Sequence, residues 1–241
     1  MFLQAEPKGW IWIERLGSLA SLGIIPLIVY LLKRIQRLRQ GRRIEAKLLP
    51  LNSGFTGLIC CVSAPHKGDP EVEAEQIAKL VEDLEFFEAD ELSQKLRATR
   101  IGPILKAFER HRKDLKHCWL IASHDSDPYE APLMRACEKY FPNVVIQPII
   151  KVNDVYAKID EVYYATHGIF NQCEKQTDGA VTPRTLIADL TGGTKIMSAA
   201  VAMACLDVDR KMQYIEQKGQ KAFYEIEITY EKVSTRPSAS V

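Results

Sequence analysis

The chain has 241 residues, of which 46% are hydrophobic and 26% are charged, and its formal net charge is +1. This composition excludes a chain disordered along its whole length, and the length suits one globular domain with an additional segment. The charge is unevenly spread, because residues 1–44 carry a balance of +6 and residues 45–241 a balance of −5. An anion bound by the acidic part must therefore be held by local geometry and not by net charge.

The apolar stretch 10–32 is long enough to cross a hydrocarbon core of about 30 Å as a helix. Residues 16–32 contain no charged side chain, and Trp10, Trp12 and Tyr30 stand near its two ends, where interfacial aromatic residues are found. We therefore predict one transmembrane helix within residues 1–35. A signal peptide, a buried helix of a soluble protein and an amphipathic helix lying on the membrane surface are the alternatives.

A cluster of basic residues follows the apolar stretch directly: Lys33, Arg34, Arg37, Arg39, Arg42 and Arg43. Such a cluster is retained on the cytoplasmic side of a membrane. The predicted protein is thus a single-pass protein of the cell inner membrane, with its N-terminus outside and its C-terminal domain in the cytoplasm. A signal peptide would instead carry its basic residues before the apolar core.

Glu14 lies inside this apolar region, next to Arg15. Either the two side chains reach the outer interface and pair there, or Glu14 faces the interior of a helix bundle and is a pore candidate. Small residues over 17–23 would allow close contact between helices. Because one helix cannot enclose a channel, a pore would require an oligomer.

The rest of the chain divides into a basic stalk and linker (36–54), a domain (55–232) and a flexible tail (233–241). The stalk is expected to begin as a helix. Within the domain, apolar runs predict strands at 57–63, 117–123, 144–150, 186–190, 211–217 and 221–231. Helical spacing of apolar residues predicts helices near 74–84, 92–113, 131–141, 154–169 and 194–206, the last of them buried because it is apolar nearly all round. The polar segment 171–183 is expected to be a long loop.

Six cysteines are present, and no CxxC motif or Cys/His spacing fits a zinc site, so no metal is expected. Cys60 and Cys61 stand together in an apolar run and are predicted to be small buried hydrophobic residues, in a reducing intracellular setting. His111, His117 and His167 are interpreted as surface or helix-end residues.

Strands that alternate with helices and are continuously apolar predict an α/β fold: a Rossmann-like parallel sheet with helices on both faces. In such folds ligands bind beyond the carboxyl ends of the strands. The candidate ligand-binding residues are therefore those that follow the strands: Ser63, Ala64, Pro65 and His66; Ser123 and His124; and Thr191, Gly192, Gly193, Thr194 and Lys195.

The last of these loops has the composition of an anion site. Glycines at a strand-to-helix turn let the backbone approach a ligand, and the N–H groups of the helix start then face an anion. Thr194 suits an N-cap, and Lys195 adds a positive charge. Its order of residues fits neither a P-loop nor the GxGxxG motif, so a nicotinamide cofactor is not expected. Asp189 is expected to hold the loop in place by hydrogen bonds, and contact with a ribose is the alternative.

The run ADLTGGTKIMSAAVAMA after three strand–helix units, with SAP and SHDS after the first two strands, resembles the CARF family (CRISPR-associated Rossmann fold) over residues 55–232. The resemblance implies binding of cyclic oligoadenylate, most often cyclic tetra-adenylate, across the axis of a homodimer. It places ligand contacts on Thr191–Lys195, and on Ser63–Pro65 with Ser123 and His124. About ten residues follow the last strand, so the predicted signalling partner of this domain is the N-terminal helix.

The sequence therefore predicts a membrane effector of type III CRISPR antiviral defence, and not an enzyme. Ligand binding would change the state of a dimer, tetramer or higher oligomer in the lipid bilayer, opening a pore that depolarises the membrane. One alternative is a ring nuclease that cleaves the cyclic ligand with help from His66, His124 or a nearby lysine. The other is a membrane-anchored nucleotide-binding scaffold. DNA or RNA duplexes are not expected as partners, because the domain is acidic.

Overall fold

The computed structural model describes residues 42–62, 69–86, 91–153, 159–207, 210–216 and 222–232. The predicted membrane span, the first part of the stalk, the loop 63–68 and the tail 233–241 lie outside these ranges. Within them, no helix combines the length and the apolar character needed to cross a bilayer. The transmembrane helix within residues 1–35 therefore stays a prediction.

The sheet of this protein runs in the order β1-β8-β7-β6-β2-β3-β4, and β5 pairs with β3 as well. Its strands are β1 (Arg42–Pro50), β2 (Gly57–Val62), β3 (His117–Ser123), β4 (Val145–Ile146), β5 (Ile150–Val152), β6 (Leu186–Asp189), β7 (Lys211–Ile215) and β8 (Phe223–Lys232). The strands from β2 to β7 pair in parallel, and β8 runs antiparallel to β7. The predicted parallel sheet and the predicted closing pair of strands are confirmed.

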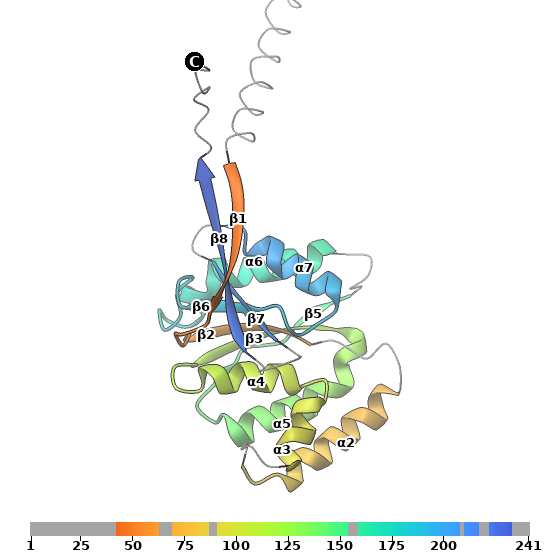
Figure 1. Ribbon diagram of the computed structural model, residues 1–241. Helices are drawn as coiled ribbons and strands as arrows, with labels where there is room; N and C mark the ends of the chain where they lie inside the picture. Colours follow the sequence, from red (N-terminus) through yellow and green to blue (C-terminus); the bar gives the residue numbers. More distant parts are fainter. Residues whose placement is uncertain are drawn as a thin grey trace, which may run out of the picture. The chain divides into compact units, whose positions relative to one another are not determined.

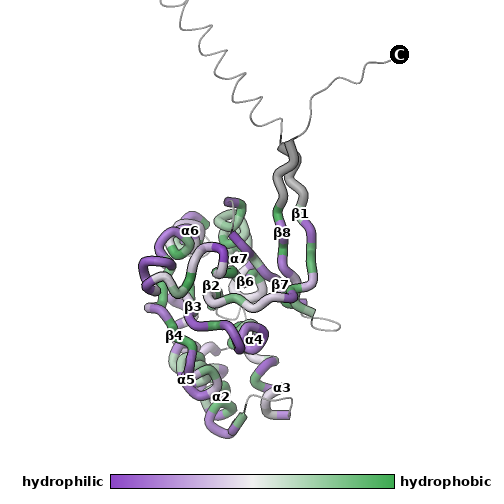
Figure 2. The backbone as a smooth tube through the Cα atoms, turned by 90° about the vertical axis from the view of Figure 1, so that its left-hand side faces the viewer, coloured by the Kyte–Doolittle hydropathy of each residue, from purple (hydrophilic) through white to green (hydrophobic). Residues whose placement is uncertain are grey.

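Helices cover both faces of this sheet, as expected for a Rossmann-like α/β arrangement. One layer holds α2 (Pro70–Asp83), α3 (Glu91–Ala98), α4 (Gly102–His111) and α5 (Glu130–Tyr140), and the other holds α6 (Ile159–Gln176) and α7 (Lys195–Ala204) (Figure 1). Figure 2 shows the same order of layers from the side. A short 3-10 helix, η1 (His124–Tyr129), joins β3 to α5.

The core lies on both faces of β2 and β3. All six residues of β2 are buried, and alternate ones point to opposite sides. Leu58, Cys60 and Val62 pack into the cluster beneath α2, α4 and α5. Trp119 of β3 faces the other layer, where its indole Nε1 donates to Oε1 of Gln176 at 2.9 Å. Burial on both faces explains why these strands have continuous apolar sequences and not alternating ones.

The cysteines follow the prediction for small hydrophobic residues. All six lie in the described part of the chain, and each is buried and forms no disulfide. Burial raises the pKa of the Cys61 thiol to about 12. This thiol is therefore protonated at neutral pH, and its role as a thiolate nucleophile or metal ligand is disfavoured.

Two predicted helices have different bounds in the structure. The helix expected over 92–113 is divided into α3 and α4, because the chain turns so tightly at Gly102 that a Cβ there would lie 2.1 Å from the carbonyl oxygen of Arg97. The helix expected to end at residue 169 continues to Gln176, so the segment predicted as a polar loop begins as helix. Cys173 is buried on its inner face, which explains why the helix continues.

The stalk is also different from its prediction, because Arg42–Pro50 forms strand β1 and not a helix. In the sheet order, β1 lies next to β8. Without β1, the edge strand of the sheet would be β8, with unpaired backbone N–H and C=O groups, and β1 pairs with these groups. This long-range pairing, which local sequence does not encode, decides the conformation of these residues.

The helix α7 is buried on one face only, although its sequence is apolar nearly all round. Met197, Ala200, Val201 and Ala204 are buried. In contrast, the side of α7 that faces away from the sheet exposes 51% of Met203, and Leu206 just beyond the helix is 40% exposed. The prediction of a fully buried helix was therefore wrong for this outer face.

Candidate functional site

The site lies at a reversal of strand order next to β2. From β2 the chain continues to β3 on one side, and it returns later to place β6 on the other side of β2. Loops that leave neighbouring parallel strands in opposite directions separate at their carboxyl ends, and the crevice that results is where open α/β sheets bind ligands. Here that crevice is bordered by the residues that follow β6, beginning with Thr191.

Both glycines of this loop are required by its contact with β2. A Cβ on Gly192 would lie 2.6 Å from the carbonyl oxygen of Cys61. Gly193 has a φ of 83°, which is left-handed backbone, and its Cβ would lie 2.7 Å from that of Cys61. The sequence argument assigned the close approach to a ligand. In the structure the backbone of the loop approaches strand β2, which fixes the position of the loop.

Asp189 holds the loop from below, as predicted. Its carboxylate accepts hydrogen bonds from the Thr191 hydroxyl (2.9 Å), the Gly192 amide (3.4 Å) and the Gln213 side-chain amide (3.3 Å). Asp189 is 1% exposed, and burial raises its pKa to about 6, against the opposing effect of these donors. At neutral pH the ionised form prevails, and all three donors match it.

The network continues to His111, a residue whose role the sequence did not indicate. His111 is the last residue of α4, in agreement with the helix-end alternative of the prediction, but it is buried, and its Nε2 lies 2.7 Å from Oε1 of Gln213. Because the Gln213 amide nitrogen donates to Asp189, its oxygen must accept, so Nε2 of His111 carries the proton. Burial lowers the pKa of His111 to about 4. The ring is thus neutral, and α4 is connected to the glycine loop through β7.

Two backbone amides on either side of the N-cap of α7 have no acceptor among the described residues. Thr194 is the N-cap, and its hydroxyl oxygen accepts from the Met197 amide at 3.2 Å, as predicted for this residue type. In the described part of the chain, no acceptor bonds the amides of Gly193 or Lys195. Such unpaired amides, together with the positive end of the helix dipole, favour an anion.

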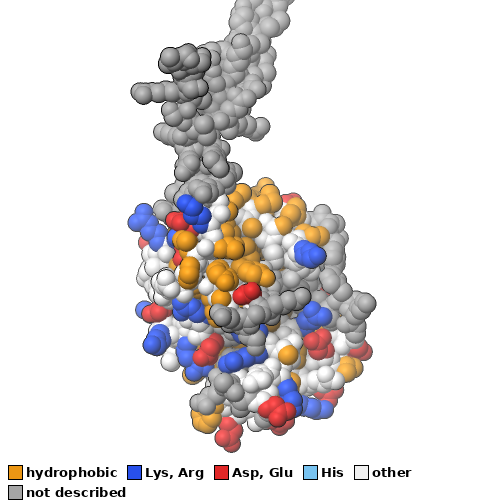
Figure 3. Space-filling view, in the orientation of Figure 1, with side chains coloured by type: hydrophobic (Ala, Val, Ile, Leu, Met, Phe, Trp, Pro, Cys, Tyr) orange, Lys and Arg blue, Asp and Glu red, His pale blue; other side chains and the backbone are white. Residues whose placement is uncertain are grey.

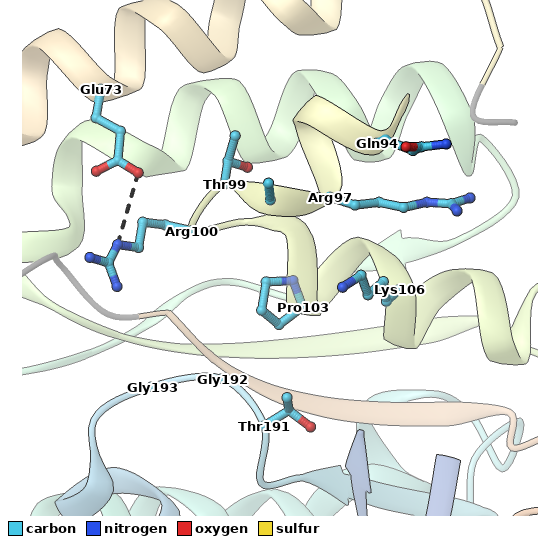
Figure 4. A pocket seen from close by; sticks show the side chains of 11 residues that line it. Glu73, Gln94, Arg97, Thr99, Arg100, Pro103, Lys106, Thr191, Gly192 and Gly193 are labelled. Carbon is cyan, nitrogen blue, oxygen red and sulfur yellow. Dashed lines mark ion pairs between the residues drawn. The ribbon is translucent and has the colours of Figure 1, made fainter. Parts of the chain in front are cut away.

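A cleft of about 700 Å³ lies between this loop and the layer of α3 and α4. Figure 4 shows Thr191, Gly192 and Gly193 on one side of it and Arg97, Arg100 and Lys106 on the other. Among the described charged residues that line the cleft, those three cations stand against one acid, Glu73. The cleft is therefore locally positive although the domain is acidic overall, which is what binding of an anion requires.

Glu73 has its own partners at one end of the cleft. Its carboxylate lies 3.9 Å from Nε of Arg100 and accepts a hydrogen bond of 3.0 Å from the buried Tyr129 hydroxyl. The sequence did not single out the cations of α3 and α4, because along the chain they look like the ordinary solvated face of an amphipathic helix. Only the break at Gly102 turns them toward the loop.

The predicted site residues fall into three groups. Thr191, Gly192 and Gly193 line the cleft, Thr194 caps α7, and Lys195 is exposed on α7 and does not line the cleft. The four candidates of the first loop (Ser63, Ala64, Pro65 and His66) and the pore candidate Glu14 lie outside the described residues.

Ser123 and His124 belong to a neighbouring part of the same sheet edge. Ser123 is buried, and its hydroxyl lies 2.8 Å from that of Ser126, which donates to the Val62 carbonyl at 3.0 Å. His124 is exposed, with Nε2 3.0 Å from the Asn153 side-chain oxygen. Neither residue lines the cleft. Among described residues, no group of three or more His, Cys, Asp or Glu side chains is arranged to hold a metal ion.

Comparisons with known proteins add a loose likeness. No model of a known protein family matches the chain, and no curated protein matches it. Among solved structures, it is similar to Csm6 from Enterococcus italicus bound to cyclic hexa-2′-fluoro-hexa-dAMP, with a TM-score of 0.40 and 10% identity over 70% of this chain. It is also similar to Can2 from Sulfobacillus thermosulfidooxidans in complex with cyclic tetra-adenylate, with a TM-score of 0.31 and 14% identity over 66% of this chain.

These alignments cover only 36% and 32% of the two known chains, so this chain spans about a third of their length. Because both TM-scores are below 0.5, the fold is assigned from the strand order and register given above and not from these likenesses.

Proposed function

We propose that the described domain is a sensor of cyclic oligoadenylate, with cyclic tetra-adenylate as the ligand, in a membrane effector of type III CRISPR defence. The proposal unites the resemblance of the sequence to the CARF family with the chemistry of the cleft. One observation carries it: the glycine loop that leads into α7 lines a cleft at the switch point of a parallel sheet, and three cations line the opposite wall.

The cleft suits the phosphates of such a ligand. The Gly193 backbone amide can donate to a phosphate oxygen, while Arg97, Arg100 and Lys106 neutralise charge. The Thr191 and Thr99 hydroxyls donate their protons to Asp189 and to the Leu96 carbonyl, so towards a ligand their oxygens act as acceptors, for example of a ribose hydroxyl. Arginine binds phosphate with two parallel hydrogen bonds, which fixes the orientation of a nucleotide as well as its charge.

A ring-shaped ligand with repeated nucleotides fits a twofold pair of domains, because each copy then offers the same loop. We place the second copy on the outer face of α7, where Ile196, Ala199, Met203 and Leu206 follow each other at helical spacing. Figure 3 shows hydrophobic side chains gathered where α6 and α7 lie in Figure 1. Since α7 begins at the glycine loop, two copies joined there would bring their two loops to one axis.

In this proposal the N-terminal segment is a transmembrane helix of the cell inner membrane, and the sensor domain is cytoplasmic. Ligand binding shifts the oligomer toward the state that binds the ligand better, and the helices open a path for ions. Strand β1 begins at Arg42, within ten residues of the end of the predicted span, and it is the element through which the domain would act on the helix.

The binding part is tested by equilibrium titration of the 241-residue chain with cyclic tetra-adenylate. We expect Lys106→Ala to weaken binding by about tenfold, because it removes a charge-assisted contact to phosphate. The matched control is Lys113→Ala, an exposed lysine just beyond the same helix, which should bind as the unchanged chain does. Equal weakening by both substitutions would show that general charge, and not the cleft, attracts the ligand.

The membrane part is tested separately, with a potential-sensitive dye in cells that make the chain and cyclic tetra-adenylate. Depolarisation is expected only when both are present, and it should be lost with Lys106→Ala. If the purified chain binds the ligand and the membrane potential stays constant, the pore is refuted and a sensor with another output remains.

A further inference from the structure

A small apolar hollow adjoins the cleft and has no role in the site described so far. It has a volume of about 140 Å³ and is lined by Arg97, Lys106, Glu109, Ile215 and Phe223. Arg97 and Lys106 line the cleft as well, so the two spaces share a wall. A hydrogen bond connects the lining of the hollow to the glycine loop: the Ile215 amide donates to the Thr191 hydroxyl oxygen at 2.8 Å.

The floor of the hollow is formed by two paired strands. Ile215 and Phe223 are directly opposed partners in the antiparallel pair of β7 and β8. The Phe223 carbonyl accepts from the Leu51 amide at 3.0 Å, and the Arg110 guanidinium lies 6.0 Å from the centre of the Phe223 ring. The Arg110 side chain also donates to the Leu51 carbonyl. An aromatic ring held in this way can receive a flat ligand without losing much conformational entropy.

The lining of the hollow matches a purine base with an amino group. Its volume is close to the about 150 Å³ of an apolar cavity that takes up benzene. The Phe223 ring and the Arg97 guanidinium are both planar groups on which nucleobases stack. Glu109 also lines the hollow, and a carboxylate accepts a hydrogen bond from an exocyclic amino group but repels a carbonyl oxygen.

We infer that this hollow binds the adenine base of the nucleotide whose phosphate lies at the glycine loop, and that Phe223 and Glu109 determine the preference for adenine. The inference rests on the proposed function and extends it, because the cleft alone selects for phosphate and not for a base. Arg97 and Lys106 then stand between the base and the phosphate of one nucleotide. The Glu109 carboxylate, which also forms an ion pair of 3.1 Å with Arg112, accepts a hydrogen bond from the amino group of the base.

The test measures binding of cyclic tetra-adenylate, AMP and IMP to the 241-residue chain. Phe223→Ala is expected to weaken binding of cyclic tetra-adenylate by about tenfold, the usual effect of losing one stacked base. Phe223→Leu keeps the apolar volume and removes the aromatic ring, so it serves where the alanine variant is unstable. The control is Tyr214→Ala, since Tyr214 is an aromatic residue of the same strand pair with a side chain on the opposite face.

Glu109→Gln supplies an independent readout of base identity. The unchanged chain should bind AMP better than IMP, and this preference should fall toward equality in Glu109→Gln, because an amide can both donate and accept. Binding of inorganic phosphate should be the same in both proteins.

The outcomes separate this inference from the proposed function. If cyclic tetra-adenylate binds, Lys106→Ala weakens it, and both Phe223→Leu and Glu109→Gln leave affinity and base preference unchanged, the base hollow is refuted and the phosphate site stands. If the unchanged chain binds no cyclic tetra-adenylate at all, the proposed function and this inference fail together.

Discussion

At the scale of single residues, burial changes the pKa of the acid that supports the glycine loop. Asp189 supports the glycine loop with a carboxylate that lies 1% exposed beneath it, at the cost of removing a charge from water. The structure compensates with three hydrogen-bond donors, and the pKa of Asp189 still rises from 3.8 to about 6. The loop is therefore held by a group whose charge changes just below neutral pH.

This pKa predicts how stability changes with pH. The folded chain binds a proton at Asp189 more readily than the unfolded chain, so the stability contributed by this group is complete below pH 3.8 and is lost as the pH rises through about 6. The loss amounts to about 3 kcal/mol. We expect Asp189→Asn to lack this dependence. Between pH 4 and pH 7 the unchanged chain should lose most of this contribution of about 3 kcal/mol relative to the variant. If urea titrations give the same difference in unfolding free energy between the two proteins at pH 4 and at pH 7, the assignment to Asp189 is contradicted.

A second residue-scale prediction concerns two glycines of the described residues that have left-handed backbone. Gly179 has a φ of 82° and open space around its Cα, whereas Gly193 has a φ of 83° and would bring a Cβ within 2.7 Å of that of Cys61. Gly179→Ala should cost about 1 kcal/mol of unfolding free energy from backbone strain alone. Gly193→Ala should cost clearly more, because steric overlap adds to the strain. Equal shifts in melting temperature would show that β2 does not constrain the loop.

At the scale of elements, the helix α6 contains a glycine with no structural need for it. Gly168 has ordinary helical backbone, and a Cβ there would meet no atom within 4 Å. Gly168→Ala should therefore raise the free energy of unfolding by about 1 kcal/mol, because alanine is the better helix former.

The contrasting position is Gly102, at the break between α3 and α4. Here a Cβ would collide with the Arg97 carbonyl, so Gly102→Ala should destabilise the fold and also weaken binding of cyclic tetra-adenylate. The same substitution thus has opposite effects in two helical elements, and thermal unfolding measures both. Stabilisation by Gly102→Ala would refute the tight turn that directs the cations toward the loop.

At the scale of the whole molecule, the proposed pairing through α7 predicts a stoichiometry. One cyclic tetra-adenylate should bind per two chains, measured by calorimetry, because each copy contributes one loop. Met203→Glu places a charge on the outer face of α7 and should give monomers with weakened binding. Val72→Glu is the matched control, since Val72 is 52% exposed on α2 in the opposite layer and Met203 is 51% exposed. One ligand per monomer, unaffected by Met203→Glu, would refute the pairing.

The predictability of the fold also depends on scale. The runs GLICCVS, HCWLIAS and LIADL are continuously apolar because their strands are buried on both faces, so the sequence alone predicted parallel strands and a ligand edge at their carboxyl ends. Thr194 and Asp189 were also predictable, because a helix cap and an acid next to a glycine turn act over a few residues of local sequence.

What the sequence alone did not determine depends on contacts between distant segments. Arg42–Pro50 is a strand because β8 lies beside it, and His111 is buried because Gln213, 102 residues away, meets its ring. The cations Arg97, Arg100 and Lys106 face the glycine loop only because the chain turns at Gly102. Local sequence specifies which residues are apolar, capped or free to turn, but a locally positive cleft requires side chains from separate elements to converge, and only packing of the layers across the sheet brings them together.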